Sequence, residues 1–287
     1  MKQKLALILV LIALMHLVSG CAPAETEEPK PTLRIAVSPD FAPMEFVDPA
    51  KRGQEQFVGF DITLAHYIAD QLGMELEIMP MEFNACQMAV YAGTVDLSIS
   101  GYTWNEKREA DYNISDRYYV GTGTDEQYLI TLGENAGIYT DAESLAGARV
   151  AVQSASLQLT LAQDQLPDSQ IHVFYDMDTA VLQLLNGDFD CIAVSGGNGE
   201  AILANHPELA RSQFSFEVDE QYRGYVILLQ KGNDELTEKV NGILASAQPY
   251  FEQWYAEARS VAGIEVSYDE QGNAVLPTEE TNSGGAG

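Results

Sequence analysis

The residue best suited to hold a small charged molecule is an arginine near the start of a predicted helix. Residues 103–106 (Thr-Trp-Asn-Glu) fit a capping box, in which the threonine caps the helix and the glutamate reaches back to it. Arg108 then lies in the first turns of a helix that directly follows a strand predicted at 96–100. Ligands of α/β proteins bind where strands end and helices start, so this guanidinium can hold a carboxylate through charge-assisted hydrogen bonds worth about 1.5–3 kcal/mol each. The alternative is a surface arginine paired with Glu106 or Asp111.

A second candidate for binding an anion is Ser156, at the start of a helix predicted at 157–165. Its hydroxyl and backbone N–H at a helix N-terminus suit a negative group, and it can act as a helix cap at the same time. The glycine-rich run at 195–199 has no following Lys-Ser or Lys-Thr, so it is not a phosphate-binding P-loop. We interpret that run as a permissive turn.

The N-terminus has the form of a secretory signal. Two lysines precede an apolar run at 5–18, which is shorter than the about 20 residues needed to span a bilayer. Residues 17–21 (Leu-Val-Ser-Gly-Cys) resemble a bacterial lipoprotein lipobox, which implies a signal peptide at 1–20 and a lipid on the sulfur of Cys21. A plain secretory peptide followed by a cysteine is the alternative. Residues 21–31, rich in Ala, Glu and Pro, are expected to form a flexible leash.

Composition excludes several classes of protein. The chain has 287 residues, 46% of them apolar, which predicts two lobes rather than one compact domain. Fifteen basic residues against 43 acidic ones give a net charge of −28, which disfavours nucleic-acid binding. Four scattered histidines and three cysteines exclude a disulfide scaffold and argue against a metal site, and we expect no cofactor. Cys86 and Cys191 are expected to be buried free thiols, with a bridge between them as the alternative.

Strand and helix patterns alternate along the middle of the chain. Strands are predicted at 33–37, 74–78, 96–100, 149–152, 171–175, 190–194 and 225–230. Helices are predicted at 61–72, 84–92, 157–165, 178–187 and from 234 past 243. This β-α-β alternation predicts an α/β fold with mostly parallel sheets flanked by helices.

Several spaced motifs in this region resemble those of the family 3 extracellular solute-binding proteins of ABC importers, the polar amino-acid binders. The motifs are Pro-Asp-Phe-Ala-Pro-Met-Glu-Phe at 39–46, Val-Gly-Phe-Asp at 58–61, Gly-Thr-Val-Asp at 93–96, Ser-Gly-Tyr-Thr at 100–103, Glu-Lys-Arg at 106–108 and Ser-Leu-Ala-Gly at 144–147. The resemblance implies a periplasmic-binding-protein-like clamshell of type II with a two-strand hinge. It places a discontinuous lobe 1 at 32–122 and 221–262 and an inserted lobe 2 at 123–220, and leaves a polar tail at 263–287 that we expect to be largely disordered.

The resemblance also assigns roles to residues of the expected cleft. It implies that Arg108 grips the ligand carboxylate, helped by Thr103 and by Gly101 of the same motif region. It implies that Ser156 provides a second grip on that carboxylate from lobe 2, where the family usually has a Gly-Thr-Thr turn. Two aromatic side chains take the places of family residues that line the pocket, with core packing as the alternative for each: Phe41, which would stack on the ligand, and Phe83.

Two departures from the family pattern bear on the ligand. Ser195 stands where the family usually has an aspartate that pairs with the ligand ammonium. Because an unpaired buried ammonium is costly, either another acid substitutes, with Asp176 and Glu45 as weak candidates, or the ligand lacks a normal free amino group. Ser38 stands where binders of basic amino acids often have aspartate, which favours a non-basic ligand.

These features predict a monomeric, lipid-anchored binding protein outside the cytoplasm. It would capture a small amino-acid-like or carboxylate solute between two lobes and deliver it to the membrane permease of an ABC importer. Two alternatives belong to other classes of function. One is a clamshell-fold enzyme resembling the dehydratases, in which Glu45 would act as an acid in the cleft, and the other is a ligand-sensing lipoprotein without transport.

Overall fold

The computed structural model describes residues 29–119, 126–268 and 274–275. The predicted signal peptide, Cys21 and most of the predicted leash lie outside the described residues. Thr32–Gly287 forms a compact unit of its own, separate from the unit that precedes it. None of the helices within the described ranges combines the length and the apolar character that crossing a bilayer requires.

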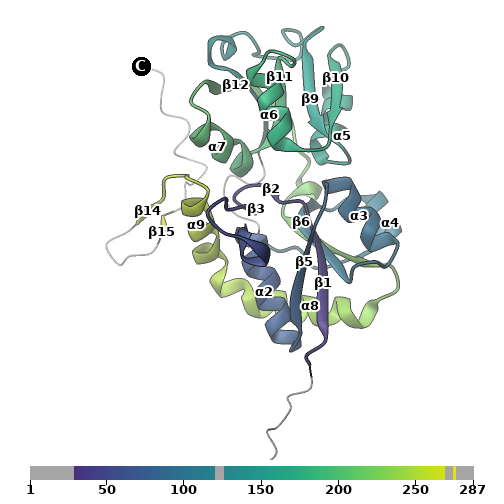
Figure 1. Cartoon of the computed structure of the whole chain (residues 1–287). Helices are drawn as coiled ribbons and strands as arrows, with labels where there is room; N and C mark the ends of the chain where they lie inside the picture. Colours follow the sequence, from purple (N-terminus) through teal and green to yellow (C-terminus); the bar gives the residue numbers. More distant parts are fainter. Residues whose placement is uncertain (1–28, 120–125, 269–273, 276–287) are drawn as a thin grey trace, which may run out of the picture. The chain divides into compact units, whose positions relative to one another are not determined.

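Two five-stranded sheets organise this unit, and each is the centre of one lobe (Figure 1). Lobe 1 is built on the sheet β5-β1-β6-β13-β7, and a small sheet β2-β3-β4 belongs to it. Its elements are β1 (Thr32–Val37), β2 (Asp40–Phe41), β3 (Glu45–Val47), η1 (Gly53–Gln56), β4 (Phe57–Val58), α2 (Phe60–Leu72), β5 (Glu75–Pro80), α3 (Phe83–Tyr91), β6 (Leu97–Thr103), α4 (Glu106–Asp111), β7 (Tyr112–Ile114), β13 (Tyr225–Gln230), α8 (Asp234–Ala247), η4 (Gln248–Tyr250) and α9 (Phe251–Val261).

Lobe 2 is built on the sheet β10-β9-β11-β8-β12. Its elements, with η3 at the return to lobe 1, are β8 (Gln127–Leu132), η2 (Gly133–Asn135), β9 (Arg149–Gln153), α5 (Leu157–Gln165), β10 (Gln170–Phe174), α6 (Met177–Leu185), β11 (Cys191–Ser195), α7 (Gly196–Asn205), β12 (Leu209–Ser215) and η3 (Glu220–Tyr222). The two sheets agree with the predicted α/β clamshell. The residue boundaries of the lobes given above stay a prediction.

Both sheets are mixed, whereas the sequence predicted mostly parallel ones. The strands of the β-α-β units pair in parallel: β1 with β5 and β6, and β9 with β10 and β11. The strands outside these β-α-β units pair antiparallel: β13 with β6 and β7, and β8 with β11 and β12. The difference arises because β8 and β13 each follow a passage of the chain from one lobe to the other, rather than a crossover helix.

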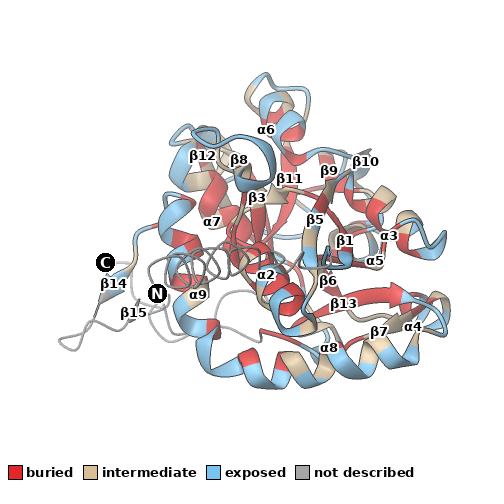
Figure 2. Ribbon diagram, turned by 60° about the horizontal axis from the view of Figure 1, so that its bottom comes forward, coloured by how far each residue is buried: buried red, intermediate tan, exposed pale blue. Residues whose placement is uncertain are grey.

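Helices cover both faces of each sheet, and the apolar faces of these helices form the cores. In lobe 1, α2, α8 and α9 pack on one face through side chains such as Phe60 and Val240, and α3 packs on the other. In lobe 2, α5 covers one face, while α6 and α7 cover the other. Figure 2 shows central strands such as β11 and β13 buried and the outer sides of helices such as α8 exposed, whereas the edge strands β5 and β10 are mostly exposed or half-buried. Cys86 and Cys191 are buried free thiols, as predicted.

The predicted C-terminal tail is not featureless where the structure describes it. Ile264 is buried and packs with Ala201 of α7 and with Ala262. Further on, β14 (Ser267–Tyr268) pairs antiparallel with β15 (Ala274–Val275).

Helix α7 was not predicted from the sequence. The glycine-rich run at 195–199, which we interpreted as a turn, forms the cap and the first turn of this helix.

Gly59 fixes the start of α2 against the segment that leads to the cleft. Its φ of 120° lies in a region that is essentially restricted to glycine. A Cβ at this position would overlap the backbone carbonyl of Met44. The backbone N–H groups of Phe60 and Asp61 donate to the carbonyls of Pro43 and Met44, so the same close approach satisfies the first turn of the helix.

Gly59→Ala is therefore expected to destabilise the protein by about 3 kcal/mol or more, because backbone strain and steric overlap add. Gly53→Ala is the matched control, since Gly53 also has a positive φ, of 64°, but its Cβ would meet open space. The control is expected to cost only about 1 kcal/mol. Urea unfolding midpoints of the two variants measure the difference, and equal losses would contradict the role given to Gly59.

Candidate functional site

A narrow cavity of about 30 Å³ lies between the two lobes. Its walls include β2, the ends of β6, β9 and β11, and the start of α5. The lining residues are Asp40, Phe41, Phe83, Ser100, Gly101, Thr103, Arg108, Gln127, Gln153, Ser156, Leu157, Gln158, Ser195 and Tyr225. All seven residues that the sequence analysis assigned to the ligand are among them.

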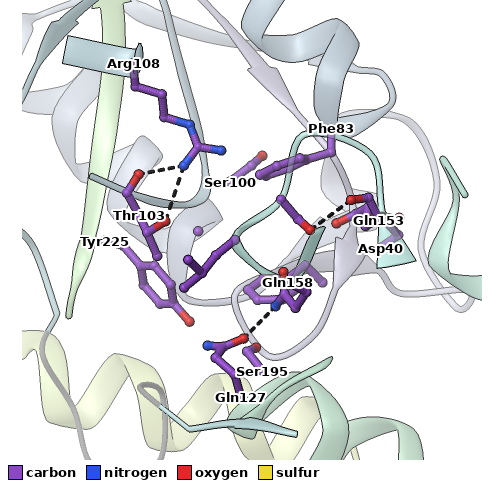
Figure 3. A pocket seen from close by; sticks show the side chains of 14 residues that line it. Asp40, Phe83, Ser100, Thr103, Arg108, Gln127, Gln153, Gln158, Ser195 and Tyr225 are labelled. Atoms are coloured by element: carbon purple, nitrogen blue, oxygen red, sulfur yellow. Dashed lines mark hydrogen bonds between the residues drawn. The ribbon is translucent and has the colours of Figure 1, made fainter. Parts of the chain in front are cut away.

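Arg108 is the positive group of this cavity, and it is only 4% exposed. Its Nη1 donates to the backbone oxygen of Thr103 at 2.6 Å and to the Thr103 hydroxyl at 3.3 Å (Figure 3). Its Nε donates to Gln87 Oε1 at 3.3 Å, and its Nη2 donates to the Ala155 carbonyl of lobe 2 at 2.9 Å. The guanidinium is therefore held in place from both lobes by neutral acceptors.

No carboxylate among the described residues forms an ion pair with Arg108. Burial lowers the pKa of Arg108 to about 10, so the group still carries its charge at neutral pH. The rings of Phe83 and Tyr102 lie 5.8 Å and 5.2 Å from the guanidinium carbon, which adds cation–π attraction. A buried cation without an anionic partner favours an anion that enters the cavity.

The helix that carries Arg108 starts two residues later than predicted. The cap of α4 is Asn105, whose side-chain oxygen accepts from the Arg108 N–H at 2.8 Å. Thr103 is instead the last residue of β6, which frees its carbonyl and hydroxyl for the guanidinium. The predicted capping box is thus wrong in its register, although Thr103 still contacts Arg108.

Ser156 caps α5, which is one of the two roles that the sequence predicted for it. Its hydroxyl accepts from the Leu159 N–H at 3.1 Å and donates to the Gln153 carbonyl at 2.8 Å. The preceding residue, Ala155, has a positive φ of 60°, a conformation in which its carbonyl accepts from Arg108. The start of α5 consequently forms the wall of the cavity opposite Arg108.

Phe41 and Phe83 both line the cavity, and each also packs against protein. A Cβ on Gly101 would lie 2.8 Å from the Phe41 ring, so the glycine allows the ring to lie flat against the end of β6. Phe41 meets Tyr225 edge to face, and Phe83 lies 4.9 Å from Tyr102 between ring centroids. The two rings therefore supply apolar wall on the lobe 1 side.

Ser195 lies on the lobe 2 side of the cavity, at the end of β11, beside Gln127 and Gln158 (Figure 3). Gln158 Nε2 donates to Gln127 Oε1 at 2.8 Å, so this part of the wall is polar and neutral. Behind Ser195, a Cβ on Gly197 would lie 2.7 Å from the Tyr255 hydroxyl of α9. The glycine-rich start of α7 thus allows lobe 2 to approach lobe 1 closely.

The sequence analysis gave no role to Asp40, yet it is the single carboxylate among the described residues that line the cavity. Its Oδ1 accepts from the Ser38 hydroxyl at 2.8 Å. Its Oδ2 accepts from the Met177 N–H at 2.9 Å and from Gln153 Nε2 at 3.2 Å, as Figure 3 shows for Gln153. One feature of the sequence could have indicated that Asp40 lies at the site: it follows the end of β1 closely and belongs to the 39–46 motif.

The two acids weighed as replacements for the missing aspartate do not line the cavity. Glu45 is fully buried, and burial together with the charge of Asp61 raises its pKa well above the usual value. Asp176 caps α6 by accepting from the Thr179 N–H at 2.8 Å. Neither candidate is therefore placed to meet a ligand in this cavity.

Comparisons with known proteins agree with this geometry. The family model described as bacterial extracellular solute-binding proteins, family 3, matches residues 33–252. The arginine-binding extracellular protein ArtP of Bacillus subtilis (strain 168) is 30% identical over 168 residues, which cover 58% of this chain and 62% of that protein. The chain thus spans less than two thirds of that relative.

Solved structures resemble a larger share of the chain. The amino acid ABC transporter substrate-binding protein AbpA from Streptococcus pneumoniae Canada MDR_19A, bound to L-arginine, has a TM-score of 0.74 and 28% identity, covering 82% of this chain and 97% of that one. An ancestral arginine-binding protein bound to glutamine has a TM-score of 0.70 and 26% identity, covering 82% and 100%. Both the family model and the structures therefore span the two lobes and the cavity between them.

Proposed function

The chain belongs to the bacterial extracellular solute-binding proteins of family 3, and on that premise we propose that it captures a small amino-acid-like or carboxylate solute for an ABC importer. The observation that carries this proposal is the buried guanidinium of Arg108, which faces the cavity and forms no ion pair among the described residues. A membrane permease would receive the solute. No covalent step is needed for this role.

The ligand carboxylate would bind Arg108. All four acceptors that now contact the guanidinium are neutral, so they satisfy its hydrogen bonds but leave its charge uncompensated. An incoming carboxylate would compete with the Ala155 carbonyl for Nη2 and gain charge-assisted bonds of about 1.5–3 kcal/mol each. Ser156, at the start of α5, lies on the opposite wall and would supply the second contact.

Binding of one ligand by both lobes explains how capture would close the clamshell. Only the closed form brings Arg108 of lobe 1 and Ser156 of lobe 2 to one cavity. A ligand that touches both walls therefore shifts the population towards closure. A micromolar affinity, which corresponds to about −8 kcal/mol, would suit capture followed by release to a permease.

We propose a non-basic ligand. Ser38 and Ser195 are neutral, and the described residues that line the cavity hold one cation, Arg108, and one carboxylate, Asp40. A ligand with one carboxylate and one ammonium matches this pair, whereas a second cation on the side chain would lack an acid. Relatives named as arginine-binding argue for the opposite choice, and glutamine in the ancestral protein argues for a neutral one.

We further propose that the protein is a monomer held outside the cytoplasm by a lipid on Cys21. The support is the lipobox-like sequence at 17–21 and the family to which the chain belongs. We also propose that the lobes divide between residues 122 and 123 and between residues 220 and 221. The first of these boundaries lies between the end of β7 at Ile114 and the start of β8 at Gln127.

Arg108→Ala is expected to weaken ligand binding at least a hundredfold, which is about 2.8 kcal/mol, because the buried positive charge is lost. Lys107→Ala is the matched control, since Lys107 is the exposed neighbour on α4 and should leave affinity unchanged. Isothermal titration calorimetry measures both variants, and circular dichroism checks that each is folded. Affinity of Arg108→Ala within threefold of the wild type would refute the assigned role.

Calorimetry against a panel of amino acids and small carboxylates tests the ligand class. We expect a neutral amino acid such as glutamine to bind at least tenfold more tightly than arginine or lysine, because a second cation finds no acid in the cavity lining. Tight arginine binding would contradict the proposal, based on Ser38 and Ser195, that the ligand is non-basic.

Cys21→Ser in the full chain is expected to abolish lipid labelling and to move the protein out of the membrane fraction, because the serine oxygen cannot take the place of the thiol. Metabolic labelling with a fatty acid and fractionation of the cells measure this. Cys191→Ser, at a buried thiol, is the control and should keep the label. Unchanged labelling of Cys21→Ser would reject the lipobox.

A further inference from the structure

Asp40 is a partly buried carboxylate that contacts both lobes at the wall of the cavity. It belongs to β2 of lobe 1, where the Ser38 hydroxyl donates to it at 2.8 Å. Its other two donors come from lobe 2: the N–H of Met177, the first residue of α6, and the side-chain amide of Gln153 at the end of β9. Closing the lobes therefore buries this carboxylate against the start of a helix.

The surroundings of Asp40 supply hydrogen-bond donors but no positive side chain. Among the described residues, no lysine, arginine or histidine forms an ion pair with it. The charged groups that act on it are negative: Asp176, the cap of α6, and Asp178 in its first turn. The carboxyl of Glu45 on β3 is also near, and burial raises its pKa well above the usual value. The thiol of Cys86 on α3, whose pKa is raised to about 12 by burial, stays neutral. Asp40 is thus a partly buried anion that lacks a cation, in the same cavity as the buried cation Arg108, which lacks an anion.

We propose that Asp40 receives the α-ammonium of the ligand and thereby links the charge of the ligand to closure of the two lobes. This inference rests on the proposed function, because it takes Arg108 as the site of the ligand carboxylate. A protonated amine near Asp40 Oδ1 or Oδ2 would compensate the charge that closure buries. The position is two residues beyond Ser38 and on the opposite lobe from Ser195, so it differs from both places where the family pattern puts an acid.

No other described acid fits this role as well. Glu45 lies outside the cavity lining, and burial together with the charge of Asp61 raises the pKa of its carboxyl well above the usual value. Asp176 and Asp178, at the start of α6, are exposed and also lie outside the lining. Among the described acids, Asp40 alone combines access to the cavity with partial burial and with donors that hold its oxygens in place.

Burial raises the pKa of Asp40 to about 6 in the closed cavity without a ligand cation. A ligand that brings an ammonium keeps Asp40 ionised, so its binding at pH 6 takes up no proton at this residue. A ligand that lacks the ammonium leaves a buried carboxylate uncompensated, so its binding at pH 6 takes up a fraction of a proton. The advantage of the ammonium-bearing ligand should therefore shrink as the pH falls below about 6, where Asp40 becomes neutral.

Two pairs of probes separate the α-ammonium from a cationic side chain. Glutamine and glutaramate, its analogue without the amino group, differ only at the α-position. Arginine and citrulline differ only in the charge of the side chain. Calorimetry at pH 7 measures all four on the wild type, on Asp40→Asn, and on Asp178→Asn as a matched control, because Asp178 is a nearby acid outside the cavity lining.

The wild type and Asp178→Asn are expected to prefer glutamine over glutaramate by at least thirtyfold. Asp40→Asn should reduce this preference to less than fivefold, because the variant loses the attraction for the glutamine ammonium and binds glutaramate without leaving a carboxylate uncompensated. Titrations at pH 6 in buffers of different ionisation enthalpy should show proton uptake with glutaramate in the wild type and none in Asp40→Asn.

The outcomes distinguish this inference from the proposed function. If Asp40→Asn keeps the full preference for glutamine, the assignment of Asp40 fails while the binding function stands. If Asp40→Asn instead removes a preference for arginine over citrulline, the carboxylate meets the side chain, and the assignment to the α-ammonium is overturned. If the wild type binds none of the four probes at millimolar concentration, both the proposed function and the inference fail.

Discussion

A buried guanidinium without an acidic partner in the described chain is the constraint on which this site depends. The acceptors around Arg108 are a carbonyl and a hydroxyl of Thr103, an amide oxygen of Gln87 and the carbonyl of Ala155. They fix the orientation of the guanidinium without neutralising its charge, and the aromatic rings of Phe83 and Tyr102 stabilise that charge further. The compensating negative charge is left for a molecule that enters the cavity, so the cost of burying the arginine is offset when a ligand binds.

The two charged side chains of the cavity both contact backbone groups of lobe 2, which would link ligand binding to closure of the lobes. Arg108 and Asp40 both belong to lobe 1, and each contacts a neutral group of lobe 2, the Ala155 carbonyl and the Met177 N–H. The closed structure buries Arg108 and partly buries Asp40, and in our proposal a ligand with one anion and one cation would compensate both. On the α7 side, the lobes also meet without a ligand charge, through the ion pair of Arg259 with Glu200 at 2.6 Å. Closure thus has a ligand-dependent part and a part built into the protein.

The sequence predicted the β-α-β elements, and the seven residues that it proposed for the ligand all line the cavity. Periodicity located β1 and α2 well, because the apolar side chains of both are buried in the core of lobe 1. It missed α7, since glycine disfavours helices and only the approach to Tyr255 in the folded chain shows why Gly197 is needed. It missed Asp40 because the acid became notable only when the donors from 153 and 177 appeared beside it. Such pairings join residues more than a hundred positions apart, and no local pattern encodes them.

Three carboxyl groups lie close together behind Phe41, and their environments give them different tasks. Burial and the charge of Asp61 raise the pKa of Glu45 well above the usual value, which favours the neutral acid at this site without a cation. Asp61 uses Oδ2 to accept from the Gly101 N–H at 3.0 Å and from the Tyr118 hydroxyl at 2.9 Å, which fixes the end of β6 at the floor of the cavity. Asp40 alone reaches the cavity itself. Glu45 and Asp61 lie outside the cavity lining, and Asp61 holds Gly101, a residue of the lining; in our proposal the charge of Asp40 would help to select the ligand.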